Sequence, residues 1–476
     1  MTPHPSERQP DDRARLTDVG LGSVARSSKI VRRLPSRFVR NPARLVAALF
    51  ALAILIGTFL LMLPGMSEDP GSAPFMTALF TSTSAVSVTG LQLVDTGSYW
   101  TGTGHVTILV LVQLGGLGIL TSTSVAFLVA VRRLGLRGQV VGSVEQEALR
   151  SNDFRLAIRT AFVVTLVAEV AIAIGIASRL AAGGTDGGSA VWQGVFHSVS
   201  AFNNAGFSLW GDSLARFATD PAMIGMFSAA IVAGGLGVPV WIDLRRSWRR
   251  PRRWSLHTKL TLATSTILLL FGAGVITWME WGNGETIGSE SPSTRIMSGI
   301  FASITARSAG FSTFDYGFAR GETLFVTDAL MFAGAGAAST GGGIKVTTLA
   351  VLFLIAWAEI RSRGDVEAFG RAVPAPIQRR AIAITVIGAT VVLFGGIALL
   401  QAAPFDFVSA LFVGTSALTT TGLSVGLAPS MPAVAIWTLI AMMFIGRVGL
   451  ITVMLALALR EQPRAYRYPE ERPIVG

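Results

Sequence analysis

Apolar residues form eight runs along the chain, each long enough to cross a membrane. The runs cover residues 43–64, 103–132, 154–181, 221–244, 257–280, 323–360, 377–401 and 431–460. A transmembrane helix needs about 20 apolar residues to cross about 30 Å of hydrocarbon. The pattern therefore predicts an all-α polytopic membrane protein with eight transmembrane helices.

A shorter and more polar segment lies between the two members of each successive pair of runs. These segments cover residues 74–91, 189–207, 293–311 and 404–423. They are too short to cross the bilayer. Irregular backbone at membrane depth is tolerated only where protein or water surrounds it. Each segment is therefore predicted to enter and leave the membrane on the same side, as a re-entrant loop.

The four short segments are copies of one another. They read "ALFTSTSAVSVTGL", "GVFHSVSAFNNAGFSL", "GIFASITARSAGFST" and "ALFVGTSALTTTGLSV". Each carries Phe, then Ser-Ala or Thr-Ala, then a glycine followed by Leu or Phe, and the third copy is one residue shorter before its glycine. The pattern recurs about every 110 residues, a period longer than that of solenoid repeats, so each copy marks a small transmembrane unit.

The pairing divides the chain into four like-oriented repeats with a tail at each end. The predicted parts are an N-terminal tail (1–42), repeat 1 (43–132), repeat 2 (154–244), repeat 3 (257–360), repeat 4 (377–460) and a C-terminal tail (461–476). Each repeat crosses the membrane twice, so all four short segments open to the same face. Connections between repeats, such as "RRSWRRPRRW", are basic and therefore cytoplasmic, whereas loops within repeats are acidic or neutral.

Composition narrows the class further. Hydrophobic residues make up 51% of the chain and charged residues only 14%, against about 25% charged in soluble domains. Cysteine is absent, which excludes disulfides and thiolate metal sites, and the four histidines are too dispersed for a metal cluster. The net charge of +11 lies in short loops beside the spans, which favours membrane lipids over nucleic acid as its partner.

The ends of the short segments predict a cation filter. Four parallel repeats are expected to pack around an axis along the membrane normal. Each segment ends in a glycine, at Gly90, Gly206, Gly310 and Gly422. Glycine permits backbone angles that aim consecutive carbonyl oxygens at the axis, and rings of carbonyls can replace the hydration shell of a cation. The alternative is that small residues only allow close helix packing, but four copies on one side favour a filter.

These four segments resemble those of the Trk/Ktr/HKT superfamily of potassium transporters, and the plan is most similar to the bacterial Ktr B-type ion-translocating subunit. The resemblance covers nearly the whole chain from about residue 40. It implies four M1–pore helix–M2 repeats in a pseudo-fourfold arrangement around one pore. The implied potassium-binding residues are Val88, Thr89, Gly90, Asn204, Ala205, Gly206, Ser308, Ala309, Gly310, Thr420, Thr421 and Gly422.

The resemblance also implies which ion is carried. In that family four filter glycines go with potassium preference, whereas a serine at the first position goes with sodium permeability. The first position here is Gly90, which implies K+ as the transported ion. Na+ dependence stays open.

The sixth apolar run is nearly twice as long as a membrane crossing requires. Its middle reads "GAGAASTGGGIK", residues 334–345, and such small and flexible residues do not hold a stable helix. We expect an intramembrane loop that obstructs the pore below the filter and moves aside, and the resemblance implies the same gate. The alternative is that these residues only kink the transmembrane helix so that it can pack. The predicted gate residues are Gly334, Gly336, Ser339, Thr340, Gly341, Gly342, Gly343, Lys345 and Arg447.

Three of the charged residues inside the apolar runs receive specific predictions. Arg447 lies near the middle of the last run, where a cation is costly and functional by default. It is predicted to hold carbonyls of the gate loop, to set a positive barrier, or to pair with an acid such as Glu169. Lys345 either acts at the gate or snorkels inward. Asp328 is predicted to be an interfacial cap.

Other classes of function fit less well. The motif G-x-x-x-x-G-K-[ST] is not met, because Ile344 separates Gly343 from Lys345, so this chain is expected to bind no nucleotide. Hydrolase and metalloprotease motifs are absent, so the chain is not expected to be an enzyme, and His197 beside Ser198 is placed in a pore helix. Secondary carriers usually have inverted repeats, and the potassium-binding subunit of an ATP-driven pump has additional spans.

The resemblance implies partners and a location. It implies a homodimer in the bacterial cytoplasmic membrane, with both termini on the cytoplasmic side. It also implies a cytoplasmic ring of nucleotide-binding regulatory subunits of the RCK type, similar to KtrA or TrkA. The basic loops and the C-terminal tail are the candidate docking surfaces.

Overall fold

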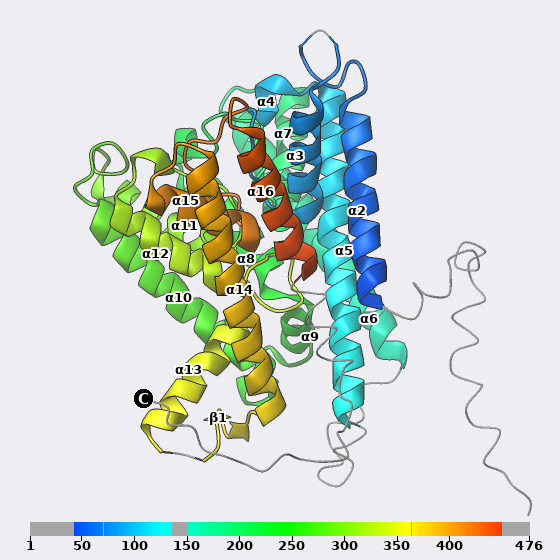
Figure 1. Cartoon of the computed structure of the whole chain (residues 1–476), viewed down its shortest axis with the longest axis vertical. Helices are drawn as coiled ribbons and strands as arrows, with labels where there is room; N and C mark the ends of the chain where they lie inside the picture. The colour runs from blue at the N-terminus through cyan, green and yellow to red at the C-terminus, as the bar shows by residue number, and fades with distance from the viewer. Residues whose placement is uncertain (1–41, 70, 136–150, 363, 450–476) are drawn as a thin grey trace, which may run out of the picture.

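The computed structural model describes residues 42–69, 71–135, 151–362 and 364–449. Most of both predicted tails and the end of the last apolar run lie outside these described residues. The described chain is mostly helical, and its only sheet is a hairpin of β1 (Glu367–Ala368) and β2 (Arg371–Ala372). Figure 1 shows the long helices running in roughly one direction, with their connections gathered at two ends.

The predicted order of long, short and long helices is present in all four repeats. The short helices are α3 (Phe75–Ser87), α7 (Gly187–Phe202), α11 (Pro292–Thr305) and α15 (Phe407–Thr419). The helices that precede them are α2 (Pro42–Leu61), α6 (Ser151–Ala182), α10 (Leu256–Glu280) and α14 (Ala375–Ala402). The helices that follow them are α5 (Gly102–Gly135), α8 (Pro221–Leu236), α12 (Gly321–Ala333) and α16 (Ala433–Phe444). Single-turn elements at the connections are α4 (Thr96–Tyr99), η3 (Ala215–Phe217), η4 (Pro251–Arg253) and η5 (Tyr316–Phe318).

Polar caps begin three of the short helices. Asp186 accepts hydrogen bonds from the N–H groups of Gly188 and Ser189 at the start of α7. Asp406 accepts a hydrogen bond from one N–H group in the first turn of α15, and Ser291 does so in the first turn of α11. These side chains satisfy N–H groups that the first helical turn leaves without partners. The short helices therefore begin at a polar surface and run into the protein, where most of their residues are buried.

Three hydrophobic clusters join neighbouring repeats. One joins repeats 1 and 4 and includes Phe80, Leu111, Leu439 and Met443. The others join repeat 2 to repeat 3 and repeat 3 to repeat 4. Because the last repeat packs on the first, the four repeats close into a ring. Figure 1 shows this closure where α16 lies beside α3, and the two helices are in contact.

Two of the eight predicted runs are broken. The expectation of a continuous span over residues 221–244 is wrong, because α8 and α9 (Val238–Ser247) meet at an angle of 97°. Gly237 forms the corner with φ +87°, and a Cβ there would overlap the carbonyl oxygen of Ala337. The run over residues 323–360 is interrupted as expected, by a loop between α12 and α13 (Val346–Ile360).

Helix length alone identifies fewer spans than the apolar pattern does. Among the described residues, three helices are long and apolar enough to cross a membrane alone, at Arg159–Ala182, Leu256–Glu280 and Ala375–Ala402, and the bent pair of α8 and α9 makes a fourth candidate. Shorter apolar helices occupy the other predicted runs, at Leu45–Leu61, Gly102–Gly118, Val346–Ile360 and Ala433–Gly449. The difference arises from breaks within runs and from the limits of the described residues.

Candidate cation filter and gate

All four short helices end in the same unusual backbone turn. The first predicted filter residue of each copy has a positive φ, and so does the glycine two positions later. The φ values are +55° and +87° for Val88 and Gly90, +59° and +69° for Asn204 and Gly206, +76° and +78° for Ser308 and Gly310, and +51° and +94° for Thr420 and Gly422. Left-handed backbone is strained for non-glycine residues, most of all for β-branched ones, and such strain concentrates at functional sites.

The four glycines meet around one point. A Cβ added to Gly90 would overlap the carbonyl oxygen of Ala205, and one added to Gly422 would overlap that of Thr89. A Cβ at Gly206 would lie 3.0 Å from the Ala309 oxygen, and one at Gly310 would lie 2.7 Å from the Thr421 oxygen. Each glycine thus faces the residue before the glycine of the next repeat, and the series closes from repeat 4 to repeat 1. The structure brings all four predicted filter segments together in one ring.

A hydroxyl six or seven residues away holds each turn. The N–H groups of Gly90 and Gly422 donate to the Oγ atoms of Ser84 and Ser416, both at 3.0 Å. In the other two copies the hydroxyl donates instead, from Ser200 to the Phe207 carbonyl at 2.7 Å and from Thr305 to the Phe311 carbonyl at 2.6 Å. The Ser and Thr positions of the repeats therefore satisfy backbone groups at the ends of the turns.

The third copy is one residue shorter before its glycine, and a tighter turn compensates for this difference. In the other copies the residue before the glycine donates its N–H to the carbonyl five residues back, as Thr89 does to Ser84 at 2.8 Å. In the third copy Ala309 donates to the carbonyl of Thr305, four residues back, at 3.0 Å. The turn is tighter by one residue, and Gly310 still reaches the ring.

A polar cavity of about 450 Å³ lies directly on one side of this ring. All four filter glycines line it, together with Asp95, Asp212 and Asp315. Burial alone would raise the pKa of Asp212, but the hydrogen bond and charge of Arg216 outweigh burial and hold this pKa below its ordinary value. The carboxyl of Asp212 therefore stays ionised, and its charge is paired with that of Arg216 at 2.7 Å.

The loop between α12 and α13 lies against the opposite side of the ring. The Gly342 N–H donates to the Ser308 Oγ at 2.7 Å, and a Cβ at Gly342 would overlap the Thr420 Oγ1. A Cβ at Gly341 would lie 3.2 Å from the side-chain amide of Asn204. The loop thus touches three of the four filter segments, so we name residues 334–345 the gate loop.

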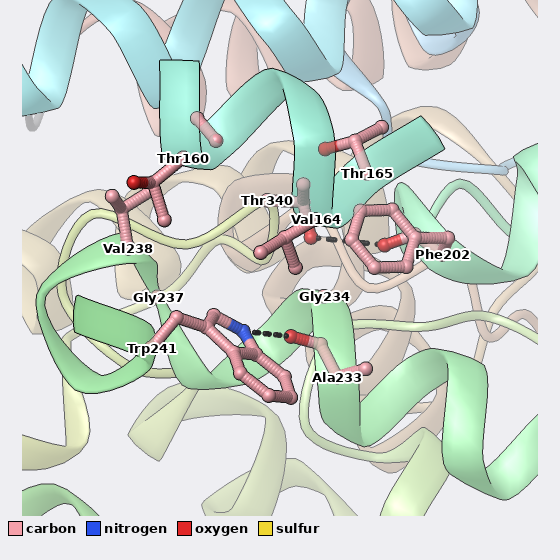
Figure 2. Close-up of a pocket in the computed structure, with 11 residues that line it drawn as sticks. Thr160, Val164, Thr165, Phe202, Ala233, Gly234, Gly237, Val238, Trp241 and Thr340 are labelled. Carbon is pink, nitrogen blue, oxygen red and sulfur yellow. Dashed lines mark hydrogen bonds between the residues drawn. The ribbon is translucent and has the colours of Figure 1, made fainter. Parts of the chain in front are cut away.

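The corner between α8 and α9 also holds the gate loop. The Gly336 N–H donates to the Gly235 carbonyl at 2.9 Å, and the Val238 N–H donates to the Ala338 carbonyl at 3.0 Å. Figure 2 shows Thr340 of the loop beside Phe202 and Gly234, where its hydroxyl donates to the Phe202 carbonyl at 3.3 Å. The 97° bend of repeat 2 therefore forms the surface on which the loop rests.

Two cations, the buried Arg447 and the partly buried Lys345, hold carbonyls of the gate loop. Arg447, which lies in a π-helical turn, η6 (Ile445–Gly449), donates to the Thr340 carbonyl at 2.6 Å and to the Thr420 Oγ1 at 3.3 Å. The Nζ of Lys345 donates to the Gly341 carbonyl at 2.6 Å. Of the alternatives for Arg447, the contact with loop carbonyls is the one present. Glu169 instead accepts hydrogen bonds from Asn203 at 3.0 Å and Gln113 at 3.4 Å.

Other predicted positions differ from expectation or were missed. Asp328 is not an interfacial cap, because it lies inside α12 and is 8% exposed. His197 lies in the short helix α7, as expected, and stacks on Trp210. The sequence reasoning missed Arg307, which donates to the Ser265 carbonyl at 3.3 Å and lines a cavity of about 150 Å³ beside the gate loop. Its signal was an arginine inside the third filter segment, directly before Ser308.

A ring of four glycine turns at the ends of half-length helices, with a loop packed beneath it, defines a pore-loop membrane protein. The family model described as TrkH, cation transport protein, matches residues 31–468. The chain belongs to this family and is a multi-pass membrane protein. Because the family consists of cation transport proteins, the prediction that the chain is not an enzyme is confirmed.

Individual relatives cover almost the same length. The chain is 34% identical over 441 residues to the Ktr system potassium uptake protein B of Bacillus subtilis. The alignment covers 92% of this chain and 97% of the relative. It is also 34% identical over 446 residues to the potassium/sodium uptake protein NtpJ of Enterococcus hirae, covering 92% and 97%. The crystal structure of the potassium transporter TrkH from Vibrio parahaemolyticus matches with a TM-score of 0.66, at 19% identity over 90% of this chain and 86% of that chain. The predicted all-α fold with pore loops is confirmed.

Proposed function

We propose that this chain carries potassium into the cell through the ring of four glycine turns. The observation that carries the proposal is the closure of that ring, in which each glycine faces a carbonyl of the next repeat. Carbonyl oxygens from four loops can replace the hydration shell of a monovalent cation. The relatives named as potassium uptake proteins match nearly the full chain and support potassium as the ion.

The charges around the ring favour a cation over an anion. The four short helices end at the ring, so the partially negative ends of their dipoles point toward it. Asp95, Asp212 and Asp315 line the adjoining cavity. Fixed negative charge at the mouth of a pore raises the local concentration of cations. Arg447 and Lys345 lie on the other side, at the gate loop, where they bind loop carbonyls.

We place the glycine-lined cavity outside the cell and the gate loop on the inner side of the filter. Basic connections between repeats, such as the one that follows α9, support this orientation by the positive-inside rule. Both termini then lie in the cytoplasm, and the membrane is the bacterial cytoplasmic membrane. The loop would close the pore until a regulatory event moves it.

Two further parts of the proposal concern assembly and coupling. We propose a homodimer whose protomers each have a pore, seated on a cytoplasmic ring of nucleotide-binding RCK-type subunits. Resemblance to the Ktr B-type subunit supports this, and the basic inner loops suit such docking. Sodium dependence is a second expectation, because one relative is named a potassium/sodium uptake protein.

Rubidium uptake into proteoliposomes tests this function directly. Purified protein should take up Rb⁺ down an imposed gradient, and external potassium should compete with it far better than sodium. The same vesicles with sodium added, or with the nucleotide-loaded regulatory ring, measure coupling and control. Uptake of an organic solute without cation flux would instead favour a secondary carrier, and a requirement for ATP hydrolysis would favour a pump subunit.

Replacing Arg447 by glutamine is expected to raise flux through the resting transporter about tenfold. The change removes the charged hydrogen bonds to Thr340 and Thr420, and hydrogen bonds to charged groups contribute about 1.5–3 kcal/mol. Stopped-flow Rb⁺ uptake without the regulatory ring measures the effect. The matched control is Arg179→Gln, which removes an arginine that is 48% exposed and pairs with Asp220. Equal flux from both variants and the wild type would contradict a restraining role for Arg447.

A further inference from the structure

The first filter residue differs between the four repeats, and only some of these side chains reach the gate loop. Val88 is apolar, and its side chain would lie 2.8 Å from a Cβ at Gly115 of α5. Ser308 and Thr420 carry hydroxyls that face the loop at Gly342. Repeats 1 and 4 are otherwise alike, since each has a hydroxyl pair beside the turn and a serine that holds the glycine N–H. Repeats 1 and 4 therefore differ in whether the side chain of the first filter residue reaches the gate loop.

Ser308 joins the gate loop to a neighbouring filter segment. Its Oγ accepts a hydrogen bond from the Gly342 N–H at 2.7 Å and donates one to the Thr420 carbonyl at 2.9 Å. The side chain is fully buried, with 0% exposed. The Thr420 carbonyl is the first of the three in the fourth filter segment and so the nearest to the loop. One hydroxyl thus links a mobile part of the proposed pore to a cation ligand.

The direction of these two bonds follows from the chemistry of a hydroxyl. A serine hydroxyl has one hydrogen to donate and two lone pairs that accept. Because the Gly342 N–H takes a lone pair, the single hydrogen points at the Thr420 oxygen. Chains of hydrogen bonds polarise one another, so the bond from Gly342 also strengthens the bond to Thr420. With the loop in place, a hydrogen is held against a carbonyl that would otherwise face a cation.

A second contact converges on the same filter residue. Arg447 donates to the Thr420 Oγ1 at 3.3 Å while it holds the Thr340 carbonyl of the loop at 2.6 Å. Thr420 is β-branched and has a φ of +51°, which is a strained conformation for such a residue. The position of the gate loop and the state of Thr420 are therefore tied through two separate side chains.

We propose that Ser308 is a positioning residue that couples the gate loop to the innermost cation site of the filter. This inference rests on the proposed function. When the loop is closed, the Ser308 hydrogen competes with the cation for the Thr420 carbonyl. When the loop leaves, the hydroxyl can turn its hydrogen away and present a lone pair. Coupling between two sites is reciprocal. Closure of the loop lowers the affinity of this site for potassium, and potassium bound at the site favours opening of the loop by the same free energy.

Potassium binding to the purified full-length transporter tests this coupling. By isothermal titration calorimetry, Ser308→Ala is expected to bind K+ about fivefold more tightly than the wild type, an effect in the range of one hydrogen bond. Resting Rb⁺ flux should rise as well, because the Gly342 N–H loses its acceptor. The control is Ser303→Ala, which removes a buried hydroxyl from α11, the helix that leads to Ser308, where it donates to the Leu269 carbonyl at 2.9 Å. This control should leave K+ affinity unchanged.

A second variant keeps the inference testable if Ser308→Ala fails to fold. Deleting residues 337–340 leaves Ser308 in place but loosens the loop, and it should tighten K+ binding to a similar degree. The double variant should add nothing further, because residues that act in one network are not additive. Wild-type affinity in both variants would overturn the coupling and leave the proposed function intact. Failure of the wild type itself to bind K+ would overturn the proposed function instead.

Discussion

Replacing Gly90 with serine is expected to lower the preference for potassium over sodium by about tenfold. The Cβ of the new residue would overlap the Ala205 carbonyl and lie 2.9 Å from the Gly206 Cα. The backbone at Gly90 also has a φ of +87°, a conformation that costs an L-residue about 1–2 kcal/mol. The ring must widen or the turn must change, and either movement displaces carbonyl oxygens from the cation. Since 1.4 kcal/mol corresponds to a factor of ten, the preference should fall by about that much.

Competition of K+ and Na+ against Rb⁺ uptake in proteoliposomes measures this preference. The chain offers a matched control in Gly65→Ser, because Gly65 has a φ of +83° but has nothing within 4 Å of an added Cβ. This control bears the same backbone strain without the steric overlap, so it should keep the wild-type preference. An unchanged preference in Gly90→Ser would mean that the ring does not select the ion. Equal losses in both variants would attribute the effect to stability.

Shortening the gate loop should make the transporter conduct without its regulator, with resting flux about tenfold or more above the wild type. The tip of the loop is held by the Ala338 carbonyl, by Thr340 and by the Arg447 contact. Its base is held separately, because the Ala335 N–H donates to the Gly342 carbonyl at 3.2 Å. Deleting residues 337–340 therefore removes the tip with its contacts and loosens the remaining loop, including the contact between Gly342 and Ser308. The obstruction and several hydrogen bonds, each worth about 0.5–1.5 kcal/mol, are lost together.

Resting Rb⁺ efflux from loaded proteoliposomes measures the effect of this deletion. The filter turns are held by Ser84 and Ser416 and not by the loop tip, so the preference for potassium over sodium should persist. Impermeability to choline distinguishes an opened gate from a leak around a damaged protein. Flux that remains as low as in the wild type would show that the loop is a packing feature and not a gate.

Much of the fold followed from local properties of the sequence. Membrane thickness sets a minimum helix length, so apolar runs of different length separate spans from short helices. The predicted segment 74–91 matches α3 and its turn, and the other three copies match as closely. The gate loop was predictable for a similar reason, because small and flexible residues interrupt a run that is too long to be one helix. Repetition within one chain then predicted the ring.

Other features of the site depended on contacts between residues far apart in the sequence. Glycines and Pro239 surround Gly237 and are local signals of a break, but they do not fix a bend of 97°. The Ala338 carbonyl that bonds Val238 lies 100 positions later. Neither hydropathy nor spacing indicates that Ser308 bonds both Gly342 and Thr420. Arg447 had two predicted kinds of partner, loop carbonyls and an acid, and the choice of Thr340 over Glu169 required the packed structure.

The sequence by itself determined the class of protein, the four repeats and the residues of the ring, because bilayer thickness and glycine chemistry act on each segment separately. Only the tertiary structure decided the left-handed turns at Val88 and Thr420, the bend of repeat 2 and the bonds between loop and filter. The bend and the bonds between loop and filter are stabilised by groups from other repeats, and a strained turn or a buried hydroxyl is tolerated only where the packed structure surrounds it with partners.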